Sequence, residues 1–215
     1  MSIESTNEHP SPTPELEVLK TKFLDIYNQN IKRPGSEEFL KWLKNADFFV
    51  APASSRFHLA KPGGLVEHSI HVYERLRALL LMEKTRNAGE VASLTPEEEE
   101  SVAICGLLHD ICKVNFYDIE MRNRKNDQGN WEKYAAYTIK DKLPYGHGEK
   151  SVYIASGFMR LKREEAMAIR WHMGGFDEAA KGGSYAVTEA FSQFPLALLT
   201  HLADIQATYL DEVEG

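Results

Sequence analysis

The feature that most restricts how this chain can fold is an apolar run that ends on two polar residues. Residues 102–108 read VAICGLL, and His109 and Asp110 follow them directly. A carboxylate that enters the interior at the end of an apolar helix is costly in free energy unless a cation accompanies it. The pair therefore predicts a buried site at a helix end, to which other parts of the chain contribute donors.

Other imidazole and carboxylate donors lie on both sides of this pair. They are His68, His147, His172 and Asp204. Such groups bind Fe, Mn, Co, Ni and Zn and, with more oxygen, Mg. Because a carboxylate has two oxygens, Asp110 can bridge two ions. One ion would also be held by His68, His109 and Asp204, and the other by His147 and His172.

Two ions bound in this way suit the hydrolysis of phosphoesters. At a separation of about 3.5–4 Å they hold a bridging hydroxide in line with phosphorus and neutralise the charge on the leaving oxygen. The alternative for His147 and His172 is a pair of hydrogen-bonded loop histidines, which would leave a one-metal site. His201 lies one turn before Asp204, and we expect it to support a ligand or pack in the core.

The donors and their neighbours form a pattern that covers about residues 45–212. Its members are His68, His109-Asp110 with Lys113, Gly146-His147, Trp171-His172 and Asp204 in a late helix. This pattern resembles the HD-domain superfamily of metal-dependent phosphohydrolases, and within it the branch in which two extra histidines bind a second metal. Residues 51–69, which include APA and GGLVEHS, also resemble the HD domain of certain bacterial 3′–5′ exoribonucleases. Cys112 departs from that family, in which a glycine commonly precedes the lysine.

Two further residues are assigned to chemistry beside the ligands. Lys113 follows His109 by one helical turn, so it should face the same cavity as Asp110 and stabilise the phosphoryl charge. We therefore predict that Asp110 and Lys113 are catalytic, with Lys113 also binding the substrate; the alternative is a solvated lysine at a helix C-terminus. His58, in the loop of residues 54–61, is expected either to contact the substrate or to have a structural role.

Composition indicates one globular unit. With 215 residues, 43% of them hydrophobic, the chain can bury a single core, and we expect one domain over residues 15–215. Residues 1–14 are polar and contain prolines, which predicts a disordered lead. Cys105 and Cys112 do not make a disulfide framework or a zinc ribbon, and they predict reduced, buried thiols in a cytoplasmic protein.

The charge balance restricts the partners. A net charge of -7 argues against extended nucleic acids and anionic membranes, because binding a phosphate backbone requires excess Lys and Arg. A small phosphorylated substrate such as a nucleotide remains compatible, since the local charge of a metal outweighs a diffuse acidic surface. We expect no signal peptide, and the sequence contains no apolar run of membrane length.

Apolar residues recur at helical spacing through most of the chain and predict an all-α helical bundle. The expected helices lie near residues 16–27, 39–43, 66–82, 96–108, 147–159, 163–172 and 188–210. Thr95-Pro96 with Glu98 is a strong helix start, with a capping threonine and a reciprocal glutamate. The pattern breaks over residues 114–143, where a turn at 126–130 between residues 116–121 and 131–139 predicts a small β-hairpin.

These observations predict an HD-type phosphohydrolase, a monoesterase or a diesterase, in which a metal-bound hydroxide attacks a nucleotide or another small phosphorylated substrate. A rival from another enzyme class is a di-iron oxygenase, because a similar His and Asp set can hold an iron pair in an HD-like fold. A third alternative is a non-catalytic nucleotide-binding module whose metal only clamps the fold. The sequence assigns neither the exact substrate nor an oligomeric state.

Overall fold

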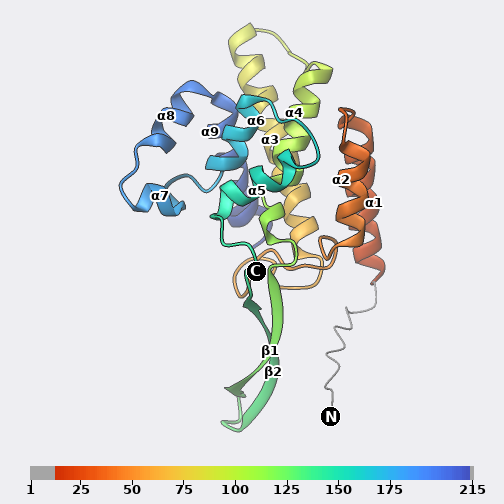
Figure 1. The fold of residues 1–215 in the computed structure, drawn as a ribbon, viewed down its shortest axis with the longest axis vertical. Coiled ribbons are helices and arrows are strands. Elements are labelled where there is room, and N and C mark those ends of the chain that lie inside the picture. The colour runs from red at the N-terminus through yellow and green to blue at the C-terminus, as the bar shows by residue number, and fades with distance from the viewer. Residues whose placement is uncertain (1–12, 214–215) are drawn as a thin grey trace.

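The computed structural model describes residues 13–213. Within that range it contains nine α-helices and one two-stranded hairpin, which confirms the all-α class with a small β insert (Figure 1). The predicted lead of residues 1–14 lies outside the described residues except for Thr13, which caps the first helix, and Pro14, which begins it. The helices are α1 (Pro14–Asn30), α2 (Ser36–Asn45), α3 (Gly64–Ala88), α4 (Pro96–Leu108), α5 (His147–Ser156), α6 (Arg163–Trp171), α7 (Glu178–Lys181), α8 (Ala186–Gln193) and α9 (Pro195–Gln206).

Helix α4 begins at the predicted capping box. The Thr95 hydroxyl accepts a hydrogen bond from the Glu98 amide at 3.3 Å, and the Glu98 carboxylate accepts one from the Thr95 amide at 2.7 Å. Two amide groups that a helix start leaves unpaired are thereby satisfied. This start sets the phase of α4, whose last eight residues, 101–108, are all buried.

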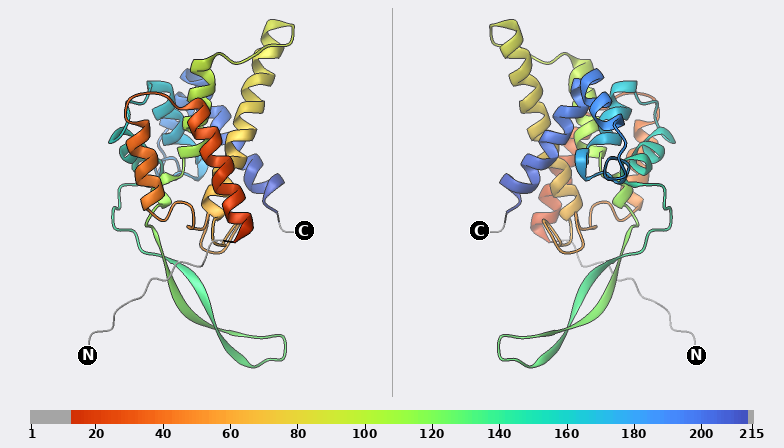
Figure 2. Two further views of the ribbon diagram at one scale, coloured as in Figure 1. Left: turned by 90° about the vertical axis from the view of Figure 1, so that its right-hand side faces the viewer. Right: turned by 90° about the vertical axis from the view of Figure 1, so that its left-hand side faces the viewer.

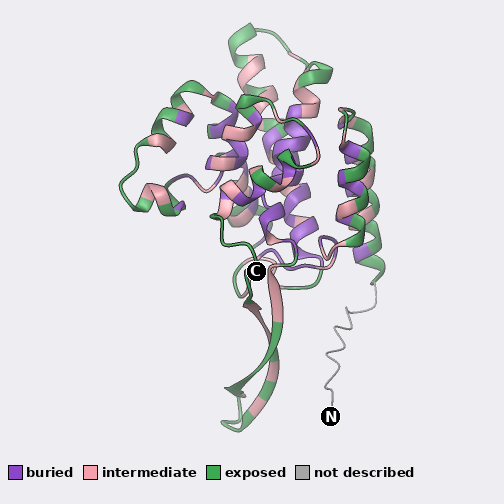
Figure 3. Cartoon of the chain, viewed as in Figure 1, coloured by how far each residue is buried: buried purple, intermediate pink, exposed green. Residues whose placement is uncertain are grey.

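Helix α4 lies at the centre of the molecule and contacts α1, α3 and α6, while α3 and α6 both pack on α9. Buried residues gather where these helices meet (Figure 3). Gly106 permits the close approach of α3, because a Cβ there would lie 2.4 Å from the Tyr73 Cα. Ile104, Leu107 and Leu108 are fully buried, and each such side chain contributes about 1.5–3 kcal/mol of hydrophobic stabilisation.

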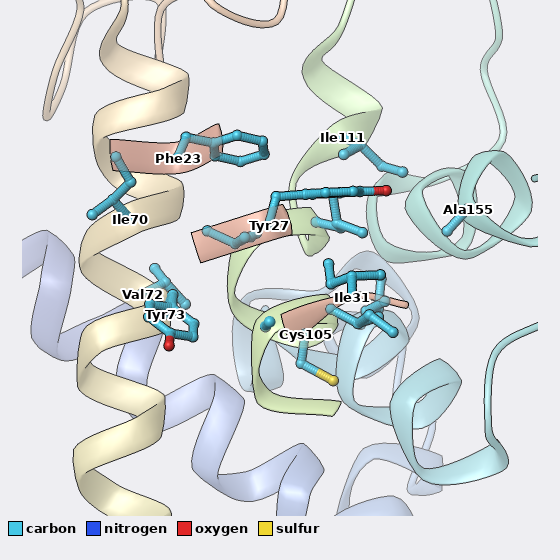
Figure 4. Close-up of a cluster of buried hydrophobic side chains, with 14 of the residues drawn as sticks. Phe23, Tyr27, Ile31, Ile70, Val72, Tyr73, Cys105, Ile111 and Ala155 are labelled. Atoms are coloured by element: carbon cyan, nitrogen blue, oxygen red, sulfur yellow. The ribbon is translucent and has the colours of Figure 1, made fainter. Parts of the chain in front are cut away.

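The first helix closes one side of this core. Phe23, Tyr27 and Ile31 project from α1 and its end toward α3 and α4 (Figure 4). The ring centroids of Phe23 and Phe48 lie 5.0 Å apart. The buried Tyr27 hydroxyl donates a hydrogen bond to the Ser36 carbonyl at 2.8 Å, which ties α1 to the start of α2.

Arg33 forms ion pairs with two glutamates and thereby joins three separate parts of the chain. Arg33, in the turn before α2, lies 2.7 Å from Glu165 of α6 and 2.9 Å from Glu100 of α4. Ser101 donates a further hydrogen bond to Glu165 at 2.7 Å. Because Glu165 is fully buried, its charge depends on these partners for compensation.

The hairpin extends away from the helical body (Figures 1 and 2). Strands β1 (Tyr117–Lys125) and β2 (Trp131–Ile139) pair antiparallel from Tyr117 opposite Ile139 to Lys125 opposite Trp131. In the turn, the Asn126 side chain accepts hydrogen bonds from two backbone amides at 3.1 and 3.0 Å. This confirms the predicted hairpin, whose first strand is longer than expected.

The prediction of one continuous helix over residues 188–210 is wrong. The chain forms α8 and α9 instead, with Phe194 extended at φ −129° and ψ 88° between them. Pro195 accounts for the break, because its ring disfavours helical backbone in the preceding residue. After α9 the chain widens into a π-helical turn, Ala207–Asp211. Within residues 13–213, no helix combines the length and apolarity needed to cross a lipid bilayer.

Candidate metal centre

His68 enters the site from the first turns of α3. The helix can begin here because Gly64 packs tightly on the preceding loop, where a Cβ would lie 2.0 Å from the Leu59 carbonyl oxygen. The buried ring of His68 places Nδ1 2.9 Å from Glu212 Oε1 and Nε2 3.3 Å from Asp204 Oδ1. A carboxylate that holds Nδ1 in this way leaves Nε2 directed at the cluster.

His109 and His172 occupy equivalent places at the C-terminal ends of α4 and α6. Each donates from Nδ1 to the carbonyl three residues earlier, at 2.9 Å to Gly106 and 2.7 Å to Ile169. Since a carbonyl can only accept, Nδ1 carries a proton in each ring, which leaves Nε2 as the atom that faces the cluster. His109 Nε2 lies 3.2 Å from His68 Nε2. The helix end thus orients both rings through a local hydrogen bond.

The two oxygens of Asp110 face different pairs of histidines. Oδ1 lies 2.7 Å from His147 Nε2 and 3.5 Å from His172 Nε2. Oδ2 lies 3.7 Å from His68 Nε2 and 3.6 Å from His109 Nε2. Asp110 therefore stands between two groups of nitrogen donors, which is the geometry that a bridging carboxylate requires.

Asp204 and His201 reach this region from α9. Asp204 faces His68, whereas the His201 ring donates from Nδ1 to the His172 carbonyl at 2.7 Å. His201 also packs against Gly174, where a Cβ would lie 2.4 Å from its ring. His201 therefore supports the segment that carries His172, as the sequence predicted, and contributes no nitrogen to the cluster.

Lys113 lies in the short 3-10 helix Ile111–Lys113 that follows Asp110. Its Nζ is 2.5 Å from Asp110 Oδ2, and only 13% of the side chain is exposed. The alternative of a solvated lysine at a helix end does not match this burial. The side chain faces the cluster, as predicted, although it does so from a separate turn and not from α4.

His58 lies beside His68 and Glu212. The two rings have centroids 5.1 Å apart, and His58 Nε2 is 3.8 Å from Glu212 Oε2. Burial lowers the pKa of His58. The structure thus places His58 at the edge of the site, and its predicted contact with substrate stays a prediction.

Glu212 is the neighbour of the site that sequence reasoning missed. It is buried and accepts hydrogen bonds from His68 Nδ1 at 2.9 Å and from His71 Nδ1 at 3.0 Å. The sequence contains no signal for this role, because Glu212 is one acidic residue among several at the end of the chain. The π-helical turn after α9 brings it back to α3.

Neighbouring carboxylates and polar groups stabilise the charged forms of His68 and His147. Burial alone would lower the pKa of His68, but its hydrogen bonds to Asp204 and Glu212 outweigh burial and raise the pKa to about 9. Burial acts in the same way on His147, where Cys112 and the adjacent carboxylate raise the pKa to about 10. Both rings therefore carry protons at neutral pH that a bound cation would displace.

The pKa values of His109, Asp110 and Asp204 are lowered instead. Burial lowers the pKa of His109 to about 3, so this ring is neutral. Burial would raise the pKa of Asp110, but the ammonium of Lys113 and the hydrogen bond from the charged His147 hold it well below its usual range. Asp204 is partly buried, and its hydrogen bond with His68 keeps its pKa below the usual range. The centre therefore combines ionised carboxylates with a neutral imidazole, the forms in which both groups bind metal ions.

The donor atoms fit one or two divalent ions. His68, His109 and Asp110 bring one ligand atom each to within 4.8 Å of one another, and so do Asp110, His147 and His172. The lone pair of His172 Nε2 is buried and has no hydrogen-bond partner. Such an atom is costly unless something binds it, and a cation between it and Asp110 would do so.

Comparisons with known proteins agree with this centre. The family model of the HD domain matches residues 65–208, a stretch that runs from the start of α3 to just past α9. Neither the curated proteins nor the solved structures contain a match to this chain. The matched stretch carries all six predicted ligands: His68, His109, Asp110, His147, His172 and Asp204. From the matched length and the clustered donors, we conclude that the chain belongs to the HD domain family, in the superfamily of metal-dependent phosphohydrolases.

Proposed function

We propose that this protein hydrolyses a phosphate ester of a nucleotide or another small phosphorylated molecule, using one or two divalent ions. The observation that carries the proposal is the placement of Asp110, whose two oxygens face different pairs of histidine nitrogens. Membership of the HD domain family supports the same chemistry.

Each donor has a place in this proposal. His68, His109, Asp110 and Asp204 would hold one ion, and His147 and His172 would hold the second together with Asp110. When bound, such ions act as Lewis acids toward phosphoryl oxygens and lower the pKa of water. The protein contributes the orientation of the imidazoles, because hydrogen bonds at Nδ1 of His68, His109 and His172 aim each Nε2 at the cluster.

Lys113 is the residue that would contact the substrate. Its ammonium lies at the cluster and is mostly buried, so it would stabilise negative charge on a phosphoryl oxygen with little loss to solvent screening. Bound ions would compensate the negative charge of Asp110, which would allow Lys113 to turn toward the phosphate. His58, beside His68, would be a second residue in contact with the substrate.

The net charge of the chain supports a small substrate. The net charge of -7 disfavours a long polyanion. This favours nucleotides and similar small esters over polymeric nucleic acids. The comparisons support the HD domain but not the exoribonuclease branch that residues 51–69 suggest. A dinuclear site accepts monoesters and diesters alike, so both belong in the assay.

The test is metal analysis followed by a substrate panel. Protein purified without added metal is analysed for bound metals and then assayed with nucleotide monoesters and diesters in the presence of Mn, Fe, Co, Ni, Zn or Mg. The matched control for Asp110→Ala is Asp127→Ala, because Asp127 is an exposed aspartate at the hairpin turn. We expect turnover that Asp110→Ala abolishes and Asp127→Ala retains. No turnover with any ion, or oxygen consumption with strong iron absorption, would contradict the proposal.

A further inference from the structure

The partner of His147 differs in kind from those of the other histidines in the cluster. The Nδ1 atoms of the other three meet oxygen, in Glu212 for His68, Gly106 for His109 and Ile169 for His172. His147 meets sulfur instead, since Cys112 Sγ lies 3.4 Å from its Nδ1. The same sulfur is 3.7 Å from His147 Nε2 and 4.0 Å from Asp110 Oδ1.

The position of Cys112 is well defined. Its side chain is buried, in the 3-10 helix that follows Asp110. Its backbone amide donates to the Ser151 hydroxyl at 3.2 Å, and Ser151 belongs to α5, the helix that begins with His147. The thiol and the imidazole are therefore held together by the packing of these two segments.

A second observation points to a ligand at this place. His172 Nε2 is buried without a hydrogen-bond partner and lies 3.5 Å from Asp110 Oδ1, the oxygen that also faces His147 and Cys112. Tetrahedral ions with sulfur at about 2.3 Å and nitrogen or oxygen at about 2.0–2.2 Å hold their donors about 3.3–3.8 Å apart. The distances of Cys112 Sγ from His147 Nε2 and Asp110 Oδ1 lie close to this range, at 3.7 and 4.0 Å.

We propose that Cys112 is a fourth ligand of the second ion, beside Asp110, His147 and His172. This inference rests on the metal binding proposed above. The sulfur would bind as a thiolate, and its proton would pass to the buffer. A thiolate favours Zn, Co and Fe over Mg and Mn, so the second site would select softer ions than the site formed by His68, His109, Asp110 and Asp204.

Cobalt spectroscopy tests the proposal without any substrate. Co²⁺ is titrated into metal-free protein while the ultraviolet and visible spectra are recorded. A thiolate ligand produces an intense charge-transfer band in the near ultraviolet, which nitrogen and oxygen ligands do not. We expect this band in the wild-type protein and its loss in Cys112→Ser. The matched control is Cys105→Ala, because Cys105 is the other thiol and lies in the hydrophobic core of α4 (Figure 4); this variant should keep the band.

The outcomes separate this inference from the proposed function. Visible cobalt bands without the charge-transfer band would overturn Cys112 as a ligand and leave the metal centre intact. Failure of the wild-type protein to bind cobalt, zinc or manganese would overturn the metal centre itself. Cadmium NMR of the wild-type protein reports sulfur coordination directly, so the test does not depend on the folding of a variant. In competition experiments, Cys112→Ser should weaken Zn²⁺ binding by about 10-fold or more and leave Mn²⁺ binding nearly unchanged.

Discussion

Replacing Lys113 by alanine separates its contribution to catalysis from its contribution to stability. In the structure its Nζ lies 2.5 Å from Asp110 Oδ2, and 13% of the side chain is exposed. The lysine thus compensates a buried carboxylate in the metal-free protein. Divalent ions would take over that compensation, which leaves the ammonium available to the substrate. The same substitution should therefore have different consequences with and without metal.

The expected magnitudes follow from these contacts. Unpairing a buried charge costs about 3–5 kcal/mol, and we expect the lower end because His147 still lies 2.7 Å from the other oxygen of Asp110. At roughly 2–4 °C per kcal/mol for a chain of this size, metal-free Lys113→Ala should melt about 6–12 °C lower. With metal bound, the Tm should change little, and kcat/KM should fall by about 10²–10³-fold, the effect of losing one preorganised charge.

The assay combines melting curves at fixed metal concentration, metal analysis and steady-state kinetics on any ester that the wild-type protein hydrolyses. Lys133→Ala is the matched control, because Lys133 is an exposed lysine on the hairpin. Metal content should stay the same in both variants. Wild-type turnover in Lys113→Ala together with a lowered Tm would remove this lysine from the mechanism and leave it with a structural role.

Three further predictions follow from the structure. Asp110→Ala should lose metal binding and hydrolysis while the helical circular dichroism persists, and an active, metal-loaded variant would contradict the bridging role. His147→Ala or His172→Ala should lose one of two ions, which is measured as metal bound per chain. If the wild-type protein saturates with one ion and neither substitution alters metal affinity or rate, these histidines belong to the structure or to the substrate pocket. Metal-free protein should lose stability as the pH rises from about 6.5 to about 10, the raised pKa of His147. A group whose pKa is higher in the folded than in the unfolded state stabilises the fold fully below its unfolded pKa. This contribution is lost as the pH rises through its folded pKa. A Tm of metal-free protein that is flat over this interval would refute it.

The ion pair network of Arg33 offers a stability test away from the centre. Arg33→Ala leaves Glu165, which is fully buried, without its guanidinium partner, and this should cost about 3–5 kcal/mol whether or not metal is present. Denaturant unfolding measures the change. A loss of less than about 1 kcal/mol, the value of an exposed pair, would show that the pair contributes as a surface contact does.

Local signals in the sequence predict the structure correctly where neighbouring residues decide it. Thr95 and Glu98 cap α4 as expected, because both partners lie within one turn. The hairpin forms where the helical spacing is interrupted. The single helix predicted over residues 188–210 is wrong. The apolar spacing continues across Pro195, but a proline disfavours helical backbone in the residue before it, so the helix ends there.

The same distinction applies to the metal centre. The sequence by itself determined the donor types and placed His109 at a helix end, where a hydrogen bond to a carbonyl three residues earlier orients the ring. Only the tertiary structure decided which histidines face which oxygen of Asp110, that Glu212 supports His68 across 144 residues of chain, and that Cys112 touches His147. The physical reason is that hydrogen bonds within a helical turn depend on adjacent residues, whereas contacts between distant segments depend on how whole helices pack.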